Sequence, residues 1–245
     1  MALRMSPSLR NCALLLGVPL LVLSPGIPST VARAQTGAPA AAVKGNPEAD
    51  RLLRRMSDYL ASLKEFAFEA DVIEEQFFEP GQRLQFGRTV RVQVRRPDRL
   101  RAESTGDQGS TEIVYDGRTA TLLDRGQNTY ITVREEGSLD RLLGRATREY
   151  SLRAPLSHLL YADPYRALPP RERMGNVIGV ARIGSHACQH LAFRQKDVDW
   201  QIWIRTGDQP LPCKLVITDR NPETRGLQFS AVFPVWVTTP RLSEA

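Results

Sequence analysis

Residues 66–72 (FAFEADV) and 84–94 (LQFGRTVRVQV) decide the fold class, because apolar residues occupy nearly every second position in both. Successive side chains of a β-strand point to opposite faces of a sheet. The alternation therefore predicts two antiparallel strands that each have one buried and one solvated face. Pro80-Gly81 lies between them and predicts the turn of a hairpin.

The same pattern continues downstream in shorter segments, which Gly, Pro, Asp and Asn residues separate. The strands expected after the hairpin are 99–104, 111–116, 118–124, 128–133, 175–183, 187–195, 199–206, 213–219 and 226–237. Helices do not alternate with these strands, which disfavours a parallel sheet. With this many antiparallel strands, the sheet is expected to curl or partly close on itself.

Two segments have helical periodicity instead. In 47–64 the apolar residues at helical spacing are Leu52, Leu53, Met56, Leu60 and Leu63, and acidic residues lie in the first turn. In 138–162, Ser138 is expected to cap one helix and Pro155 to begin a second, and both helices carry leucines on one face. The fold class is therefore mainly antiparallel β with helices (α+β).

The first 34 residues indicate export. They combine Arg4 and Arg10, an apolar run over 12–23 and the sequence Ala32-Arg33-Ala34, as secretory signal peptides do. The apolar run is about half of the ~20 residues that a membrane-spanning helix needs. We expect a signal peptide over 1–34, a flexible leader over 35–46 and a single domain over 47–240, with an uncleaved N-terminal anchor as the alternative. After cleavage the protein would be periplasmic and not integral to a membrane.

Charge gives little support to nucleic-acid binding. The 245 residues carry a formal charge of +6, but the signal segment holds three arginines and no acidic residue, so the mature chain keeps +3. Six arginines cluster around the expected hairpin, namely Arg88, Arg91, Arg95, Arg96, Arg99 and Arg101. A solvated strand face balanced by acidic residues is the favoured interpretation, and contact with lipid head groups is the alternative.

Two cysteines, Cys188 and Cys213, remain in the exported part, where a disulfide can persist. In a simple meander they would lie two strands apart, beyond the ~7 Å between Cα atoms that a disulfide allows. A bulge or another strand order would have to bring them together.

Groups suited to catalysis or metal binding are sparse. His186, Cys188 and His190 share one face of an expected strand, but the outer two lie ~13 Å apart, too far to bind one ion. The sequence contains no G-x-S-x-G or H-E-x-x-H motif and no glycine-rich phosphate loop. We expect no catalytic residue, no metal and no cofactor.

The order of elements resembles the periplasmic lipoprotein-carrier superfamily typified by LolA and LolB. Arg96-Pro97-Asp98-Arg99-Leu100-Arg101 resembles a turn between two early strands of that group, and Tyr115-Asp116-Gly117-Arg118 resembles its next hairpin. Residues 188–218, with His190-Leu191-Ala192-Phe193-Arg194, Asp199-Trp200-Gln201-Ile202-Trp203-Ile204 and Pro210-Leu211-Pro212, resemble the predicted periplasmic family called domain of unknown function 2092. The resemblance covers about residues 48–238. It implies an incomplete, strongly curved β-barrel of about eleven strands, with an N-terminal helix and a two-helix lid over an apolar cavity.

We predict that this barrel and its lid enclose a hydrophobic ligand. Trp200, Ile202 and Ile204 share one face of a strand and Trp203 lies on the other, so both faces accept apolar side chains. The candidate cavity residues are Phe68, Val72, Phe86, Val92, Leu142, Leu159, Trp200, Ile202, Trp203 and Ile204. For Trp203, packing under a helix or at the rim is an equal alternative.

The predicted function is a non-catalytic, carrier-like periplasmic protein that binds a lipid or an acyl chain. The alternative is a cell-envelope module, structural or protein-binding, that has no lipid ligand and docks an envelope protein. An enzyme is the third hypothesis, and it would require a role for His186, Cys188 and His190.

Overall fold

The computed structural model describes residues 45–79, 81–150, 154–167, 174–222 and 226–240. The expected signal peptide over 1–34 and most of the leader over 35–46 lie outside the described residues. The chain divides into two units, 1–41 and 42–245, and the description concerns the second. None of the helices in the described ranges combines the length and the apolar character that a membrane span requires.

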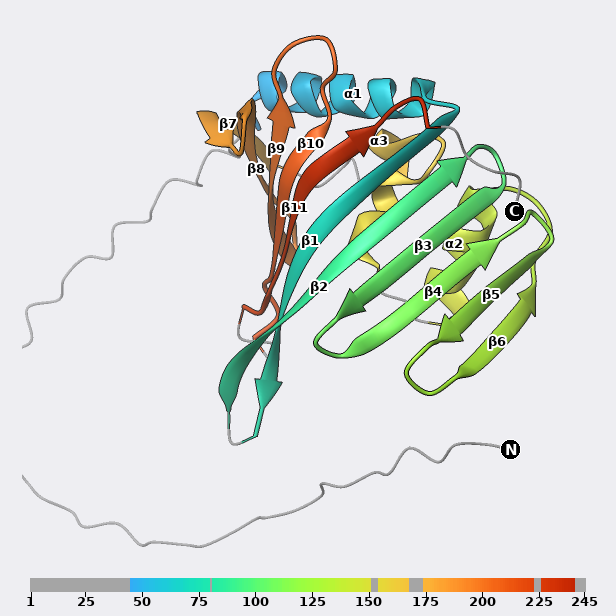
Figure 1. Cartoon of the computed structure of the whole chain (residues 1–245). Helices are drawn as coiled ribbons and strands as arrows, with labels where there is room; N and C mark the ends of the chain where they lie inside the picture. Colours follow the sequence, from blue (N-terminus) through green and yellow to red (C-terminus); the bar gives the residue numbers. More distant parts are fainter. Residues whose placement is uncertain (1–44, 80, 151–153, 168–173, 223–225, 241–245) are drawn as a thin grey trace, which may run out of the picture. The chain divides into compact units, whose positions relative to one another are not determined.

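In the described residues, eleven strands form one antiparallel sheet, which Figure 1 shows strongly curved. The strands are β1 (Glu65–Phe78), β2 (Gln82–Arg95), β3 (Arg99–Gly106), β4 (Gly109–Tyr115), β5 (Thr119–Asp124), β6 (Thr129–Arg134), β7 (Met174–Ile183), β8 (His186–Arg194), β9 (Val198–Arg205), β10 (Pro212–Asp219) and β11 (Gln228–Val237). Their order is β6-β5-β4-β3-β2-β1-β11-β10-β9-β8-β7, so β6 and β7 are the edge strands of the described sheet. The predicted incomplete, curved barrel is confirmed.

The first and last strands of the domain are neighbours in the middle of this sheet. β1 pairs with β2 on one side and with β11 on the other, for example Val72 with Arg88 and with Ala231. The sheet is therefore made of two meanders, β1–β6 and β7–β11, that join where the domain begins and ends. Their turns are as expected, and Gly81 and Gly117 have positive φ angles of 112° and 85°, which glycine adopts readily.

The helical segments are α1 (Pro47–Ser62), α2 (Leu139–Tyr150), the 3₁₀ turn η1 (Pro155–Leu159) and α3 (Pro164–Ala167). α1 matches its prediction, and the Asn46 side chain caps it by accepting a hydrogen bond of 2.9 Å from the Glu48 amide. The predicted second lid helix is only a 3₁₀ turn. The additional α3 was not predicted, although Asp163, whose carboxylate accepts a hydrogen bond from the Arg166 amide, and Pro164 form a standard helix start.

The main core lies between the inner face of the sheet and the helical segments; in Figure 1, α2 and α3 lie within the curve and α1 runs across its upper end. Its buried residues include Leu53, Met56 and Leu60 of α1, Phe66 and Phe68 of β1, Leu139 and Leu143 of α2, and Leu159 and Leu160 at η1. The leucine faces that sequence periodicity predicted for the helices are therefore the faces that pack on the sheet.

A second, small core lies on the outer face of β8–β10. It consists of Cys188, Trp203, Cys213 and Val216. Cys188 and Cys213 form a disulfide across β9, and their Cα atoms are 6.9 Å apart. β10 has a register shift between Pro212 and Lys214, at Cys213 itself, so a bulge of the kind required for this pairing is present.

Candidate ligand-binding cavity

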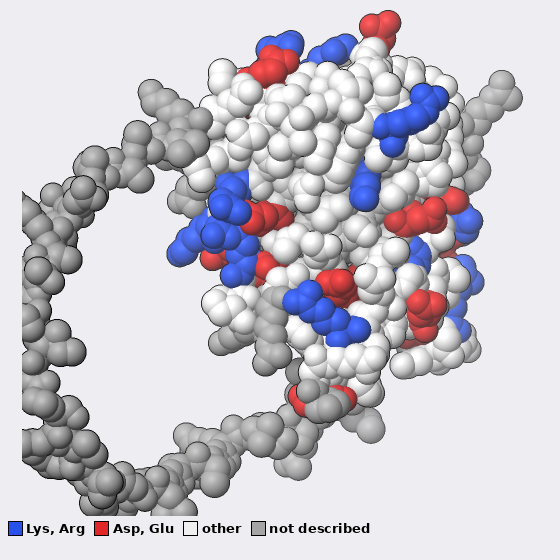
Figure 2. Space-filling model, turned by 90° about the vertical axis from the view of Figure 1, so that its left-hand side faces the viewer, with Lys and Arg blue, Asp and Glu red and all other residues white. Residues whose placement is uncertain are grey.

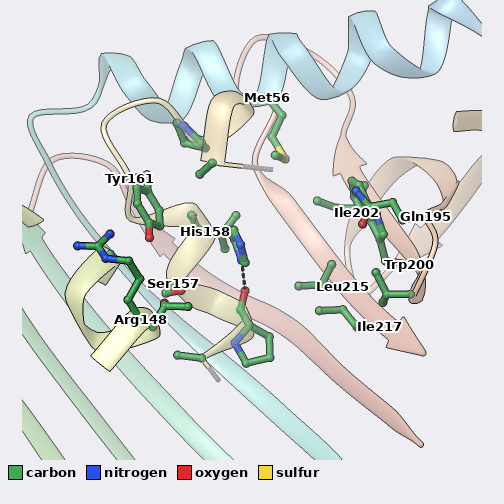
Figure 3. Close-up of a pocket in the computed structure, with 18 residues that line it drawn as sticks. Met56, Arg148, Ser157, His158, Tyr161, Gln195, Trp200, Ile202, Leu215 and Ile217 are labelled. Carbon is green, nitrogen blue, oxygen red and sulfur yellow. Dashed lines mark hydrogen bonds between the residues drawn. The ribbon is translucent and has the colours of Figure 1, made fainter. Parts of the chain in front are cut away.

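A cavity of about 620 Å³ lies between the inner face of β9–β10 and the helical segments. Its lining residues are Met56, Gly144, Thr147, Arg148, Ala154, Pro155, Ser157, His158, Leu159, Tyr161, Pro164, Ala167, Gln195, Val198, Trp200, Ile202, Leu215 and Ile217. Figure 3 shows two walls, with Trp200, Ile202, Leu215 and Ile217 opposite Arg148, Ser157 and Tyr161. Pockets that take one small ligand have volumes of roughly 300–1,000 Å³, so the space suits a single ligand.

The strand wall is apolar because alternate residues of β9 and β10 point inward. The register pairs Trp200 with Ile217 and Ile202 with Leu215, so four apolar side chains form a continuous surface. The Trp200 ring also stacks on Phe193 of β8, with ring centroids 4.1 Å apart. This stacking fixes the orientation of the indole on the cavity wall.

The helical wall carries most of the polar atoms. The His158 ring projects into the cavity in Figure 3, and its Nδ1 lies 3.4 Å from the Pro155 carbonyl oxygen. Burial raises the pKa of the Tyr161 hydroxyl, Asp140 raises it further, and Arg148 opposes them. Tyr161 is therefore a neutral phenol and a hydrogen-bond donor at neutral pH.

Hydrogen bonds to the main chain hold this wall in place. Arg96, at the end of β2, donates from Nη1 to the Leu160 carbonyl oxygen at 2.7 Å and from Nε to that of Leu63 at 3.2 Å. Asp140 of α2 accepts a hydrogen bond of 2.8 Å from the Ala162 amide. The segment after η1 is thus tied both to the sheet and to α2.

Three of the predicted cavity residues, Leu159, Trp200 and Ile202, line this cavity. The other inward-facing candidates do not line the cavity. Four of them are buried in the main core, namely Phe68, Val72, Val92 and Ile204. Leu142 is partly buried against that core, and Phe86 is half-buried in the β1–β2 hairpin. Lining residues that were not predicted include Arg148, His158, Tyr161, Leu215 and Ile217. The β9–β10 register could have identified the last two. Arg148 is one of the polar residues of α2, and His158 and Tyr161 lie in or next to the single turn η1, which is too short for periodicity to mark.

Trp203 lies on the outer face, as the odd spacing from Trp200 predicted, and it does not line the cavity. Its ring stacks on His190 with centroids 4.0 Å apart, and Lys214 Nζ lies 5.1 Å from the ring centroid. Only 8% of Trp203 is exposed, because these neighbours and the disulfide cover it. Its burial requires neither a helix nor the rim.

On β8, Cys188 and His190, which the sequence offered as candidate functional groups, take part in other interactions. The Cys188 sulfur belongs to the disulfide, and His190 Nε2 lies 2.9 Å from Gln201 Oε1. Within the described ranges, no group of three or more His, Cys, Asp or Glu side chains is arranged to hold a metal ion.

Most of the clustered arginines have acidic partners. Arg88, Arg91, Arg95 and Arg101 form ion pairs of 2.7–2.8 Å with Glu74, Glu69, Glu65 and Glu103, respectively. The side of the molecule drawn in Figure 2 likewise shows Lys and Arg intermixed with Asp and Glu around a broad uncharged area. For Arg91, Arg95 and Arg101 this agrees with an outer strand face whose charges are balanced locally, whereas Arg88 lies on the same face as Val72.

Residues 49–245 match a family model described as predicted periplasmic protein (DUF2092). Among solved structures, the chain is similar to lipoprotein LppX of Mycobacterium tuberculosis, with a TM-score of 0.50 and 11% identity over 82% of this chain and 100% of that one. LprF from Mycobacterium bovis gives a TM-score of 0.49 and 13% identity over 81% and 97% of the two chains. A LolA superfamily protein from Nitrosomonas europaea gives 0.35 and 6% over 79% and 94%. At these identities the likeness concerns the fold alone, and no curated protein matches the sequence.

Proposed function

The chain belongs to the DUF2092 family of predicted periplasmic proteins, and from that premise we propose that it binds one hydrophobic chain, such as a lipid acyl chain, between β9–β10 and the helical segments. The protein acts as a carrier-like binder in the periplasm. Its cavity is the binding site, and the helical wall is the part that a ligand must pass or displace.

The observation that carries this proposal is the continuous apolar wall of a cavity that the described residues leave unfilled. Trp200, Ile202, Leu215 and Ile217 face a volume of about 620 Å³. Burial of about ten methylene groups there would contribute about 8 kcal/mol before the cost of association is subtracted. That is sufficient for useful affinity without any specific polar contact.

The polar groups of the cavity support a binder rather than an enzyme. Ser157 and His158 are the nearest approach to a nucleophile and a base in the lining, and in the described residues no hydrogen bond joins them. Adjacent residues of a helical turn diverge, so a rotation of one side chain alone would not align them.

Filling the cavity tests the proposal. Ile217→Trp adds volume at the strand wall, and Val232→Trp adds the same ring on the outer face of β11, where Val232 is exposed. Native mass spectrometry of protein purified from its own periplasm should show a lipid-sized adduct on the wild type and on Val232→Trp, and little on Ile217→Trp. An unliganded wild type that also fails to bind the neutral probe N-phenyl-1-naphthylamine would contradict the proposal.

A second candidate is a protein-binding envelope module, and the open sheet edges favour it. Edge strand β6 exposes Tyr130 and Ile131 by 72% and 65%, and edge strand β7 exposes Ile178 and Val180. Edges with exposed apolar residues and unpaired backbone groups are templates for strand addition. Crosslinking in cells that captures a stoichiometric partner on a lipid-free protein would favour this second function.

A further inference from the structure

We infer that the ligand is a single-chain amphiphile with an anionic head group, and that Arg148 binds the head. This inference rests on the proposed function and adds the chemical class of the ligand. Its basis is a group of hydrogen-bond donors on the helical wall that have no acceptor in the described part of the protein.

Arg148 differs from the other arginines of α2. Arg141 and Arg145 both pair with Glu135, at 2.5 and 2.7 Å. Among the described residues, Arg148 has no carboxylate within ion-pair distance and no hydrogen-bond acceptor, and it lines the cavity. An arginine at the cavity wall without a counter-ion can take an anion from outside the protein.

Gly144 makes room for this guanidinium. It lies one helical turn before Arg148, and a Cβ at Gly144 would lie 3.0 Å from Arg148 Nη1. The guanidinium therefore folds back over the bare backbone of α2. Both residues line the cavity, and the Arg148 side chain is itself exposed, so the charge lies on the helical wall where solvent also reaches it.

Two further donors lie on the same wall. In Figure 3, Tyr161 and Ser157 lie on the side of the cavity where Arg148 is, and neither hydroxyl has a hydrogen bond in the described residues. Asp140 is the nearby acid, but it accepts the hydrogen bond from Ala162 and, with burial, keeps Tyr161 protonated. The wall thus presents a cation and hydroxyl donors, which is the complement of a carboxylate or phosphate.

The strand wall, on the opposite side of the cavity, indicates that the rest of the ligand is apolar. It is apolar along Trp200, Ile202 and Leu215, so a chain can lie against the strands while its head contacts the helical wall. The volume of about 620 Å³ suits one chain rather than several. A neutral head group would lack the charge-assisted hydrogen bond that an anionic head group can make with the exposed guanidinium.

The test compares three probes of equal chain length on the delipidated mature protein: palmitate, hexadecyl phosphate and hexadecanol. Displacement of N-phenyl-1-naphthylamine measures their affinities. We expect the two anions to bind roughly tenfold more tightly than hexadecanol, because one charge-assisted hydrogen-bonded pair typically contributes that much. The preference should shrink as ionic strength rises.

Arg148→Gln should remove this preference while hexadecanol binding stays unchanged, and Arg148→Lys should restore part of it. Arg182→Gln, at an exposed arginine of β7 outside the cavity lining, is the matched control and should behave as wild type. Equal affinities for palmitate and hexadecanol in the wild type, or equal losses for both in Arg148→Gln, would overturn the inference and leave the proposed function standing. If none of the three probes binds, the proposed function falls and this inference falls with it.

Discussion

The two faces of the sheet are stabilised in different ways, and neighbouring residues of β1 show the contrast. Phe68 points inward, where its ring contacts those of Phe233 and Trp236 at centroid distances of 5.7 and 4.8 Å. Glu69 points outward and pairs with Arg91 at 2.8 Å on the next strand. Burial therefore stabilises the inner face, whereas local charge pairs accompany the outer face of β1 and β2.

The outer face changes character at the other end of the sheet. On β8–β10 a disulfide, Trp203, His190 and Lys214 replace the ion pairs. The inner face changes as well, since it is filled by aromatic rings at Phe68 but leaves a cavity at Trp200. The half of the sheet with a second core outside is thus the half that is incompletely filled inside. We interpret the outer core as support for strands that lack full packing on their inner side.

The largest expected effect comes from removing an inner-face ring. Phe68→Ala should lower the free energy of unfolding by about 3–5 kcal/mol, because a ring that is 3% exposed leaves a cavity in packed surroundings. Urea denaturation followed by circular dichroism measures the change. A decrease in the free energy of unfolding of less than about 1 kcal/mol would show that the inner face is loosely packed around Phe68. It would then not differ from the inner face around Trp200.

Removing the disulfide of the outer core should cause the second-largest loss of stability. The double variant Cys188→Ser, Cys213→Ser should lose about 2–4 kcal/mol, since the disulfide joins cysteines that lie 25 positions apart in the sequence. The comparison of oxidised and reduced wild type by urea denaturation provides the matched control. If reduction leaves stability unchanged, the outer core does not support the sheet.

Removing the buried carboxylate of Glu135, which pairs with Arg141 and Arg145 of α2, should cause the third-largest loss of stability. Hydrogen bonding from Arg145 lowers the pKa of Glu135, Arg141 lowers it further, and burial opposes them. Because the folded pKa lies below the unfolded value of about 4.3, the stabilisation is complete above that pH and is lost as the pH falls through the folded pKa. Glu135→Gln should lose about 1–3 kcal/mol at neutral pH.

Melting temperatures measured from about pH 7 down to pH 3 check this sign. The wild-type and Glu135→Gln curves should converge toward the acid end. Curves that stay parallel would mean that the Glu135 charge does not contribute to stability. Asp124→Asn, at the end of β5 before the turn to β6, is a control for general acid effects.

The smallest effect is expected on the outer face of β1 and β2. Arg91→Gln should change the free energy of unfolding by less than about 1 kcal/mol, because the Arg91 side chain is exposed and solvent screens its pair with Glu69. Urea denaturation in low and high salt should show no large difference. A loss comparable to that of Phe68→Ala would break the contrast between the two faces.

Sequence patterns predicted much of this architecture because strand alternation and helix amphipathicity are local properties. The segments predicted as 99–104, 187–195 and 213–219 are β3 (Arg99–Gly106), β8 (His186–Arg194) and β10 (Pro212–Asp219). The lid was harder to predict, since η1 and α3 are single turns that are too short for periodicity to mark. His158 and Tyr161, in or next to η1, became candidate site residues only once that segment had been placed over the strands, and Arg148 did so only once α2 had been placed there.

The sequence by itself determined that this protein has an export signal pattern, an antiparallel strand sequence, one long amphipathic helix and a face on which Trp200 and Ile202 lie together. Each of these depends on residues a few positions apart. Only the tertiary structure decided that β1 pairs with β11, that Cys188 reaches Cys213 across β9, and that a cavity remains beside Trp200. Those features depend on register between distant strands and on the volume left between packed side chains, and neither quantity is encoded in any single local pattern.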